Sequence, residues 1–395
     1  MSVRAVLLGA FVAGLGLSIT LSESALALLT LLWLWRLRDP AVRAAQRWPL
    51  ALPVLAWSAV SVLSALLSGH PGASLLAAKG LLLAAALYVT ADALRGPEDA
   101  GRFLLGLVLA SGVAALVGLF QVGLCPGLDN EQTPHWLYHR CDRAHGFFSI
   151  YMTLAGVLSL VLLATLPSLL ARSSAARRLV VSWLVMLAAL VVTYTRGAWI
   201  GFAAGVLTMA AMVQRVRWLL VGGLLLLVAG AVASPYELRH RLLSMADPEE
   251  AGVRERVYMW RSGLAMWREH PILGVGPGGV KRDYLRYALP EAVKKRTGHV
   301  HNTPLQVLVE RGVVGLAAWL WIWVAFYLDA IRRLRRLPSE AGAERALVVG
   351  SVVAITGFLI GGLSEYNFGD SEVVMVAWAV MALPWATGEA ASKDS

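Results

Sequence analysis

Residues 298–328 read GHVHNTPLQVLVERGVVGLAAWLWIWVAFYL, and they join a polar segment to a long apolar run. Thr303 and Gln306 have the spacing of a capping box, with a proline between them at the first helical position. We therefore expect a helix to begin at Thr303. Its unpaired N–H groups and the positive end of its dipole would face His299 and His301. Such a helix end suits an anion, phosphate above all.

The composition of the chain is that of a membrane protein. Of its 395 residues, 58% are hydrophobic and only 15% are charged, whereas soluble domains have roughly 45–50% and 25%. Twelve apolar runs are candidates for spanning helices, and several are short enough to require a locally thinner bilayer. The runs cover residues 5–21, 24–36, 49–67, 73–91, 103–124, 147–170, 178–194, 197–213, 218–234, 304–328, 346–363 and 372–388. The sequence predicts an all-α polytopic membrane protein with about 12 transmembrane helices.

The first apolar run also resembles a signal peptide. Arg4 precedes it, and the residues SESALA follow it in the manner of a cleavage site. A second apolar run begins at once, however, and covers residues 24–36. We therefore expect two short spanning helices joined by a tight turn.

Lysine and arginine are unequally distributed between the connections of these runs. Alternate connections and the two termini hold 18 of them, whereas the opposite short connections hold only Arg140, Arg143 and Arg196. The positive-inside rule then places both termini in the cytoplasm and all eight histidines outside it. The net charge of +10 does not indicate nucleic acid, because much of it lies in these short inner connections.

This orientation divides the chain into three parts. Residues 1–234 would form transmembrane helices 1–9, and residues 304–395 would form helices 10–12. Between them, residues 235–303 would form one large periplasmic loop. Any chemistry of the chain would therefore face outward.

Cys125 and Cys141 are the only cysteines, and both fall in a second outward connection. An oxidising compartment favours a disulfide between them, and two free thiols are the alternative. The same connection holds His135, His139 and His145, so an HxxxH spacing is present. Zinc sites need more regular ligand pairs, and a disulfide would engage Cys141, so we expect no metal here.

Residues 253–270 have the pattern of an amphipathic helix that lies on a membrane surface or forms a lid. The expected apolar face contains Val253, Val257, Trp260, Leu264 and Trp267. The arginines that recur every seven residues along one flank are Arg254, Arg261 and Arg268. Interfacial anchoring explains these three well enough. Arg256 lies on the other flank, next to Trp260, and it is the stronger candidate for binding.

Two further stretches could contact phosphate. Arg196 lies in VVTYTRGAWIGF between two runs, where Gly197 allows close approach of the backbone, and we favour ligand binding over anchoring. The glycine-rich turn, HPILGVGPGGV at residues 270–280, follows no strand, so a phosphate-binding P-loop is rejected. A tight re-entry turn over the membrane is the favoured interpretation.

Two ionisable residues fall within apolar runs. Lys79 lies in the middle of its run, where a functional cation and a buried structural pair are equally good explanations. Glu310 lies about 10 Å along the expected helix from its start. It does not share a helix face with His301, so we expect it to orient a neighbouring arginine.

Four segments in this order resemble the O-antigen ligase and polymerase superfamily: TRGAWIGF, RVYMW, HPILGVGPGG and HNTPLQVLVERGVVG. The motifs fall within residues 185–330, and the expected topology extends the resemblance over the whole chain. Members are polytopic, GT-C-like glycosyltransferases of the bacterial inner membrane. The resemblance implies a Gram-negative cell, a periplasmic active site and no cofactor or metal.

The resemblance also implies an activity and roles for residues. The protein would transfer polymerised O-antigen from undecaprenyl pyrophosphate to lipid A-core, with inversion. Arg196 and Arg256 would hold the pyrophosphate, and His301 would deprotonate the acceptor hydroxyl or bind a phosphate oxygen. His299 is an additional histidine, which leaves open which of the two acts. The other expected substrate contacts are Arg254, Arg261 and His299, and the supporting residues are Glu310, Asn302, Trp260 and Lys79.

Three alternatives remain. An O-antigen polymerase would use a second lipid-linked glycan as its acceptor, but such enzymes tend to have two large periplasmic loops. A protein-glycosylating ligase of the same superfamily is the second. A lipid or polysaccharide transporter, from another class, would show internal repeats and ionisable residues along a central path, and we see neither clearly.

Overall fold

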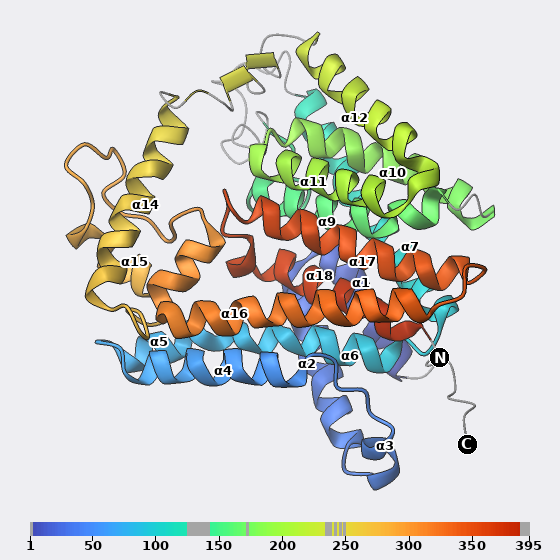
Figure 1. Ribbon diagram of the computed structural model, residues 1–395, viewed down its shortest axis with the longest axis horizontal. Coiled ribbons are helices and arrows are strands. Elements are labelled where there is room, and N and C mark those ends of the chain that lie inside the picture. Colours follow the sequence, from blue (N-terminus) through green and yellow to red (C-terminus); the bar gives the residue numbers. More distant parts are fainter. Residues whose placement is uncertain are drawn as a thin grey trace.

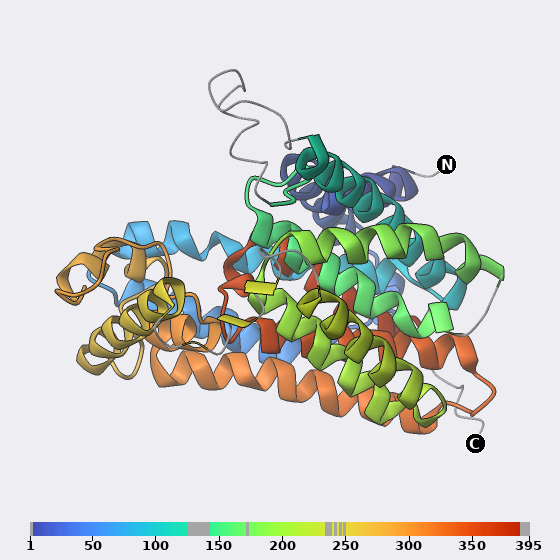
Figure 2. The ribbon, with the colours of Figure 1, turned by 90° about the horizontal axis from the view of Figure 1, so that it is seen from above.

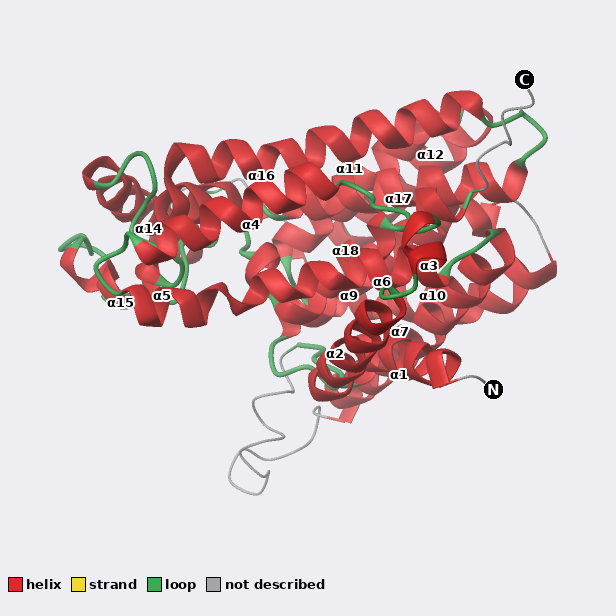
Figure 3. Ribbon diagram, turned by 90° about the horizontal axis from the view of Figure 1, so that it is seen from below, coloured by secondary structure: helices red, strands yellow, loops and turns green. Residues whose placement is uncertain are grey.

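The described part of the chain is helical, and no strand occurs in it (Figure 3). The computed structural model describes residues 3–387 apart from 125–142, 171–173, 234–238, 241–242, 245–246 and 248–249. Within these residues, seven helices are long and apolar enough to cross a membrane, and five more apolar helices are shorter. The all-α class is confirmed and a multi-pass membrane protein is indicated, whereas the count of 12 spans stays a prediction.

The first half of the chain alternates long helices with short turns. Its α-helices and 3-10 helices (η) are α1 (Val3–Leu17), α2 (Ile19–Arg36), α3 (Pro40–Ala44), α4 (Ala51–Leu66), α5 (Pro71–Ala77), η1 (Ala78–Ala84), α6 (Ala85–Ala93), α7 (Pro97–Leu124), α9 (Tyr151–Leu170) and α10 (Ser174–Val192). Ser18 alone separates α1 from α2, and its side chain caps α2 by accepting from the Leu21 N–H. A tight turn between two helices is confirmed, but it lies at Ser18, inside the first expected run of residues 5–21.

The second half contains the polar segment and the last apolar helices. Its elements are α11 (Arg196–Met212), η2 (Gln214–Val216), α12 (Arg217–Val232), α14 (Ala251–Glu269), α15 (Gly279–Asp283), η4 (Tyr284–Arg286), α16 (Thr303–Arg336), α17 (Gly342–Gly361), η5 (Asn367–Gly369), α18 (Ser371–Met381) and η6 (Leu383–Ala386). Helix α14 coincides with the amphipathic helix expected at residues 253–270. Helix α16 begins at the residue expected from the sequence.

The helices run mainly along the long axis of the molecule (Figure 1). Helix α16 extends over most of this length, with α14 and α15 beside its first turns. The view from above shows α14 and α15 at the same end of the bundle (Figure 2). Helices α14 and α15 therefore form a layer at one end of the apolar bundle.

Helices α11 and α17 approach each other closely through glycine. A Cβ on Gly201 would clash with the Gly357 carbonyl, and a Cβ on Gly361 would lie 3.2 Å from the Gly197 carbonyl. Small residues four apart allow such contact between membrane helices, because backbones can then touch. This packing places Arg196, the first residue of α11, beside the end of α17.

Helix α16 is interrupted at Gly312, whose φ of 64° and ψ of −169° are not helical. The glycine-rich turn lies against this break and pairs with it. The Val275 N–H donates to the Val309 carbonyl at 3.0 Å, and the Val313 N–H donates to the Pro271 carbonyl at 2.9 Å. An interrupted membrane helix persists only where other groups satisfy its backbone. The turn expected as a re-entry over the membrane thus acts as the partner of a broken helix.

Glu310 and Arg311 lie at the break and form a buried ion pair. Arg311 Nη1 is 3.1 Å from Glu310 Oε2, and Gln306 Nε2 donates to Glu310 Oε1 at 2.9 Å. Arg311 Nε donates to Ser61 Oγ of α4 at 3.0 Å, and its guanidinium lies 4.7 Å from the Trp57 ring centroid. Buried charges persist only when they are paired and hydrogen-bonded. Glu310 therefore holds an arginine that connects α16 to α4.

The buried side of α14 differs from the apolar face expected from the sequence. Met259, Ser262, Gly263 and Met266 are buried, whereas Leu264 is exposed. A Cβ on Gly263 would lie within 3.3–3.7 Å of side chains of Val300, Leu305 and Val309. Small residues of α14 form the contact with α16, because they permit the closest approach of the two helices. The expected face was wrong by about a third of a turn.

Candidate active site

A cavity of about 430 Å³ lies where α11, α14 and the segments before α16 and after α17 meet. Its charged lining residues and histidine are Arg143, Arg196, Arg256, Lys294, Glu250, Glu255, Glu365 and His301. Four cations thus face three carboxylates. The structure brings together the three residues expected to be catalytic, Arg196, Arg256 and His301.

Arg196 is held at the cavity wall by contacts with the polar segment. Its Nη1 is 3.1 Å from Glu250 Oε2, and its Nη2 donates to Ser244 Oγ at 2.7 Å. Glu250 also caps α14 by accepting from the Val253 N–H at 3.0 Å. Burial alone would raise the pKa of Glu250, but hydrogen bonds from Arg196 and from backbone N–H groups lower it. Arg196 Nε is buried and has no hydrogen-bond partner within the described residues.

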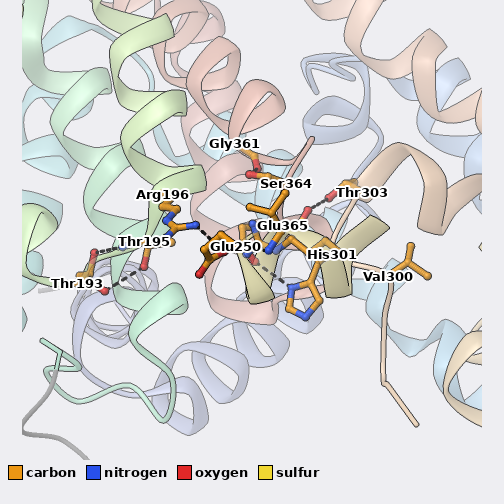
Figure 4. Close-up of polar contacts among 12 residues, drawn as sticks. Thr193, Thr195, Arg196, Glu250, Val300, His301, Thr303, Gly361, Ser364 and Glu365 are labelled. Atoms are coloured by element: carbon orange, nitrogen blue, oxygen red, sulfur yellow. Dashed lines mark hydrogen bonds and ion pairs between the residues drawn. The ribbon is translucent and has the colours of Figure 1, made fainter. Parts of the chain in front are cut away.

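Glu365 joins Arg256 to His301. Its Oε1 is 2.7 Å from Arg256 Nη2, and its Oε2 is 3.2 Å from His301 Nδ1. Figure 4 shows Glu365 beside His301, with Glu250 and Arg196 on its other side. A carboxylate at Nδ1 favours the tautomer that carries its proton there, so Nε2 is left to accept a proton.

The backbone holds His301 in an unusual conformation, with φ of 50° in the left-handed region. The next residue, Asn302, is the N-cap of α16, and its Oδ1 accepts from the Leu305 N–H at 2.8 Å. The sequence had indicated Thr303 as the cap, which is wrong by one residue. Thr303 Oγ1 instead donates to the Glu365 carbonyl at 2.9 Å. This bond and the cap fix His301 relative to Glu365.

The first N–H groups of α16 are not available to an anion. The Thr303 N–H donates to the Gly362 carbonyl at 2.7 Å, and the Gln306 N–H donates to the Asn302 carbonyl at 2.8 Å. The expected capture of phosphate by the free N–H groups of this helix is therefore wrong. Side-chain cations, and the helix dipole behind them, are the groups that can face an anion here.

His299 lies next to His301 but faces a different cavity. The two ring centroids are 4.2 Å apart, and His299 lines a cavity of about 250 Å³ between α9, α11 and α17. Burial, and then the charge of His301, lowers the pKa of His299 to about 4. A histidine that stays neutral at pH 7 offers no positive charge to phosphate, and His299 does not line the cavity of Arg196 and Arg256.

His299 should make stability depend on pH. Its pKa of about 4 in the folded state lies below the ordinary value of about 6.5, so unfolding binds a proton between these pH values. The stabilisation is fully present above pH 6.5 and falls as the pH is lowered towards 4. We expect the melting temperature of His299→Gln to fall less between pH 7 and pH 5 than that of the unchanged protein. Thermal unfolding in detergent measures this, and equal slopes would contradict it.

The remaining expected site residues lie elsewhere or support the site indirectly. Trp260 Nε1 donates to the Val300 carbonyl at 3.0 Å, and Asn302 Nδ2 donates to the Leu363 carbonyl at 2.8 Å, so both position the histidine segment. Arg254 and Arg261 are exposed on α14 and do not line the cavity. Lys79 is exposed in η1 and away from the cavity, so the buried pair considered for it is wrong.

Cys125 and Cys141 lie outside the described residues, so their disulfide stays a prediction. Among the residues that are described, no group of three or more His, Cys, Asp or Glu side chains is arranged to hold a metal ion.

The sequence did not single out Glu365 or Glu250. Glu365 lies in the short connection between the last two apolar runs, and Glu250 lies in a charged stretch with several neighbours of its kind. The one available signal was that the Glu365 connection falls on the same side of the membrane as His301 in the expected topology. A carboxylate close to arginines and a histidine in space is not visible from spacing along the chain.

Fold and site together define a helical membrane protein with a cationic cavity and a histidine at one end of its bundle. Residues 181–320 match the family model described as O-antigen ligase. This confirms the resemblance over the segment that contains Arg196, Arg256 and His301. Glu365 lies beyond the matched residues.

Similarity to a curated protein supports the same family resemblance. The chain is 25% identical over 150 residues to the exopolysaccharide production protein ExoQ of Rhizobium meliloti (strain 1021). The match spans 35% of this chain and 34% of that protein, about a third of each. Both similarities support a ligase or polymerase type of function in polysaccharide synthesis at a membrane.

Proposed function

We propose that this protein is an O-antigen ligase. It transfers polymerised O-antigen from undecaprenyl pyrophosphate to a sugar hydroxyl of lipid A-core, at the periplasmic face of a Gram-negative inner membrane. The observation that carries this proposal is the convergence of Arg196, Arg256 and His301 on one cavity, with Glu365 between the last two.

The proposed reaction follows from the positions of these groups. His301 Nε2 takes the proton of the acceptor hydroxyl as its oxygen attacks the anomeric carbon of the donor. The bond between that carbon and the phosphate oxygen breaks, and undecaprenyl pyrophosphate leaves with the electron pair. Attack from the opposite face inverts the configuration. Arg196 and Arg256 stabilise the charge on the leaving pyrophosphate.

The arginines keep donors for a pyrophosphate although each already has a carboxylate partner. A guanidinium has five N–H donors, and Arg196 Nε is buried without a partner in the described structure. Four cations against three carboxylates leave the lining positive when His301 is neutral. The carboxylates thus position the arginines before the donor binds, which limits the reorganisation that catalysis requires.

The proposal includes the topology inferred from the sequence. Both termini would be cytoplasmic, and residues 235–303 would form the periplasmic loop domain between residues 1–234 and 304–395, which span the membrane in twelve helices. The position of the cavity at one end of the bundle is consistent with this arrangement, since α14 lies at that end (Figure 1).

A polymerase is the second candidate, and one observation favours it. The curated relative is named for exopolysaccharide production rather than for lipopolysaccharide. A polymerase would use the same donor chemistry with a second lipid-linked glycan as acceptor.

Reconstitution separates these functions. The full chain is placed in liposomes with radiolabelled glycan on undecaprenyl pyrophosphate, and lipid A-core, a second lipid-linked glycan or an acceptor protein is added in turn. Labelled lipid A-core supports the ligase, and a lengthened lipid-linked glycan indicates the polymerase. Labelled protein indicates the protein-glycosylating relative. Movement of the glycan across the bilayer without a covalent product would show a transporter instead.

Glu365→Gln is expected to lower the turnover rate by about 10- to 100-fold, less than loss of the base itself. The glutamine amide can still form a hydrogen bond with His301 Nδ1, but the substitution removes the negative charge that holds Arg256. Glu372→Gln in α18 is the matched control, because that carboxylate does not line the cavity. Initial rates in the same liposomes measure both, and an unchanged rate for Glu365→Gln would remove Glu365 from the site.

A further inference from the structure

A second group of arginines lines a cavity of about 460 Å³ far from His301. Its charged and amide lining residues are Arg36 at the end of α2, Gln46 and Arg47 after α3, Asp92 in α6 and Arg95 after α6. Three arginines therefore face a single carboxylate. We call this cavity the arginine pocket.

The arginine pocket lies at the opposite end of the bundle from the candidate active site. Arg47 donates to the carbonyl of Trp385, and the guanidinium of Arg333 lies 4.9 Å from the centroid of the Trp385 ring. Arg333 is in the last turn of α16, whereas His301 precedes the first turn. Although α16 is interrupted at Gly312, it extends over most of the length of the molecule (Figure 1). The two cavities are therefore separate sites.

The lining of the arginine pocket supplies too little negative charge to balance its arginines. Asp99 accepts from the backbone N–H of Arg95 at 3.3 Å but does not line the pocket. Asp92 Oδ2 is already 2.7 Å from Arg4 Nη2 and 2.9 Å from Arg36 Nη1. Within the part of the chain that the structure describes, the side chain of Arg47 contacts only a neutral carbonyl. The side chain of Arg95 has no ion pair or hydrogen bond within the described residues. Like charges held around a partly enclosed cavity repel one another, and an anion between them removes that repulsion.

Aromatic residues of the kind that gathers at membrane interfaces lie beside the arginine pocket. Trp33 lies 5.5 Å from Trp48 and is stacked 5.9 Å from Tyr88 between ring centroids. Gln46 of the pocket wall accepts from Trp33 Nε1 at 3.1 Å, which connects the two groups. Tryptophan and tyrosine gather at the interface between the hydrocarbon and water. On helix α2, which contributes Arg36 to the pocket, Leu28 is 52% exposed and Leu31 is 64% exposed, so part of this helix presents apolar side chains outward.

We propose that the arginine pocket binds the headgroup of an anionic phospholipid of the surrounding bilayer. Arg36, Arg47 and Arg95 hold its phosphate, and its acyl chains lie along the exposed apolar side of α2. Basic pockets between membrane helices recognise anionic lipids in this way. The exposed leucines of α2 and the aromatic residues beside the pocket favour a lipid over a free phosphate ion. The proposal rests on residence in a membrane and is independent of the glycan-transfer reaction.

Native mass spectrometry of the full-length protein tests this site. Phosphatidylglycerol, phosphatidylcholine or inorganic phosphate is added to the delipidated protein in detergent, and the bound adducts are titrated. We expect tighter binding of phosphatidylglycerol than of phosphatidylcholine, and no displacement by millimolar phosphate. Arg95→Gln and Arg47→Gln should each weaken phosphatidylglycerol about tenfold.

Arg102→Gln is the matched control. Arg102 is 74% exposed on α7, is paired with Glu98 at 3.4 Å and does not line the arginine pocket. Its loss should leave lipid binding unchanged. Arg47 also contacts Trp385, so if its variant unfolds, Arg95→Gln decides the test, since no partner of that guanidinium occurs among the described residues. Equal binding of the two lipids, displacement by phosphate, or an equal loss in Arg102→Gln would overturn the proposal.

Discussion

Replacing His301 with asparagine is expected to lower glycan transfer by about 10²- to 10⁴-fold, the contribution of a positioned general base. Asparagine tolerates a positive φ, so it suits the backbone angle of 50° at this position. Its amide can bond to Glu365 but has no group that takes a proton near neutral pH. The initial rate of transfer to lipid A-core in liposomes measures the effect.

Two comparisons make this result specific. His270→Asn changes an exposed histidine at the end of α14, and its rate should match that of the unchanged protein. His299→Asn changes the ring next to His301, and it should cost much less, because His299 lines the other cavity. If His301→Asn ligates at the normal rate, or if His299→Asn has the larger effect, His301 is not the base.

The largest effect on stability is expected from Gly312→Ala. A Cβ at Gly312 would overlap the backbone of Ile272, in the glycine-rich turn that pairs with the break in α16. The backbone angles at this position are also essentially restricted to glycine, and a side chain there costs about 1–3 kcal/mol before any clash. We expect the melting temperature in detergent to fall by several degrees and the yield of folded protein to drop. Size-exclusion chromatography after heating measures both.

Gly298→Ala is the control for this substitution. Gly298 precedes the two histidines, its φ is not in the left-handed region, and no atom lies within 4 Å of a Cβ added there. Its melting temperature should not change. A Gly312→Ala protein as stable as the control would show that the turn does not hold the broken helix.

The sequence predicted the helices well because each signal for them is local. Every apolar run corresponds to one helix or to consecutive helices. Helix α14 occurs where the helical period of its sequence predicted it, and α16 begins where the capping box and proline predicted it. Predictions that depended on which segments lie together in space were less successful. The buried face of α14 depends on Gly263 against Val300 and Val309, contacts between segments that spacing along one helix does not reveal.

The predictions for the candidate site divide in the same way: those that rested on motifs succeeded, and those that depended on distant contacts did not. Arg196, Arg256 and His301 came from motifs, and the structure places all three around one cavity. Glu365 was missed because it is 64 residues beyond His301 and stands in no motif used. The anion site expected at the start of α16 failed for a similar reason, since the Gly362 carbonyl that occupies the Thr303 N–H comes from a distant connection.

The pairing of the broken helix also has a consequence for how the protein is made. Arg311 finds its partner Ser61 across 250 residues, and Arg256 finds Glu365 across 109. A growing chain therefore presents Arg256 before it presents Glu365, the carboxylate that holds it, whereas Arg196 and its partner Glu250 are only 54 residues apart. Contacts so distant along the chain are made slowly. The site is completed only once Glu365 has been made, so a chain that stops before Glu365 carries Arg256 without that counter-charge.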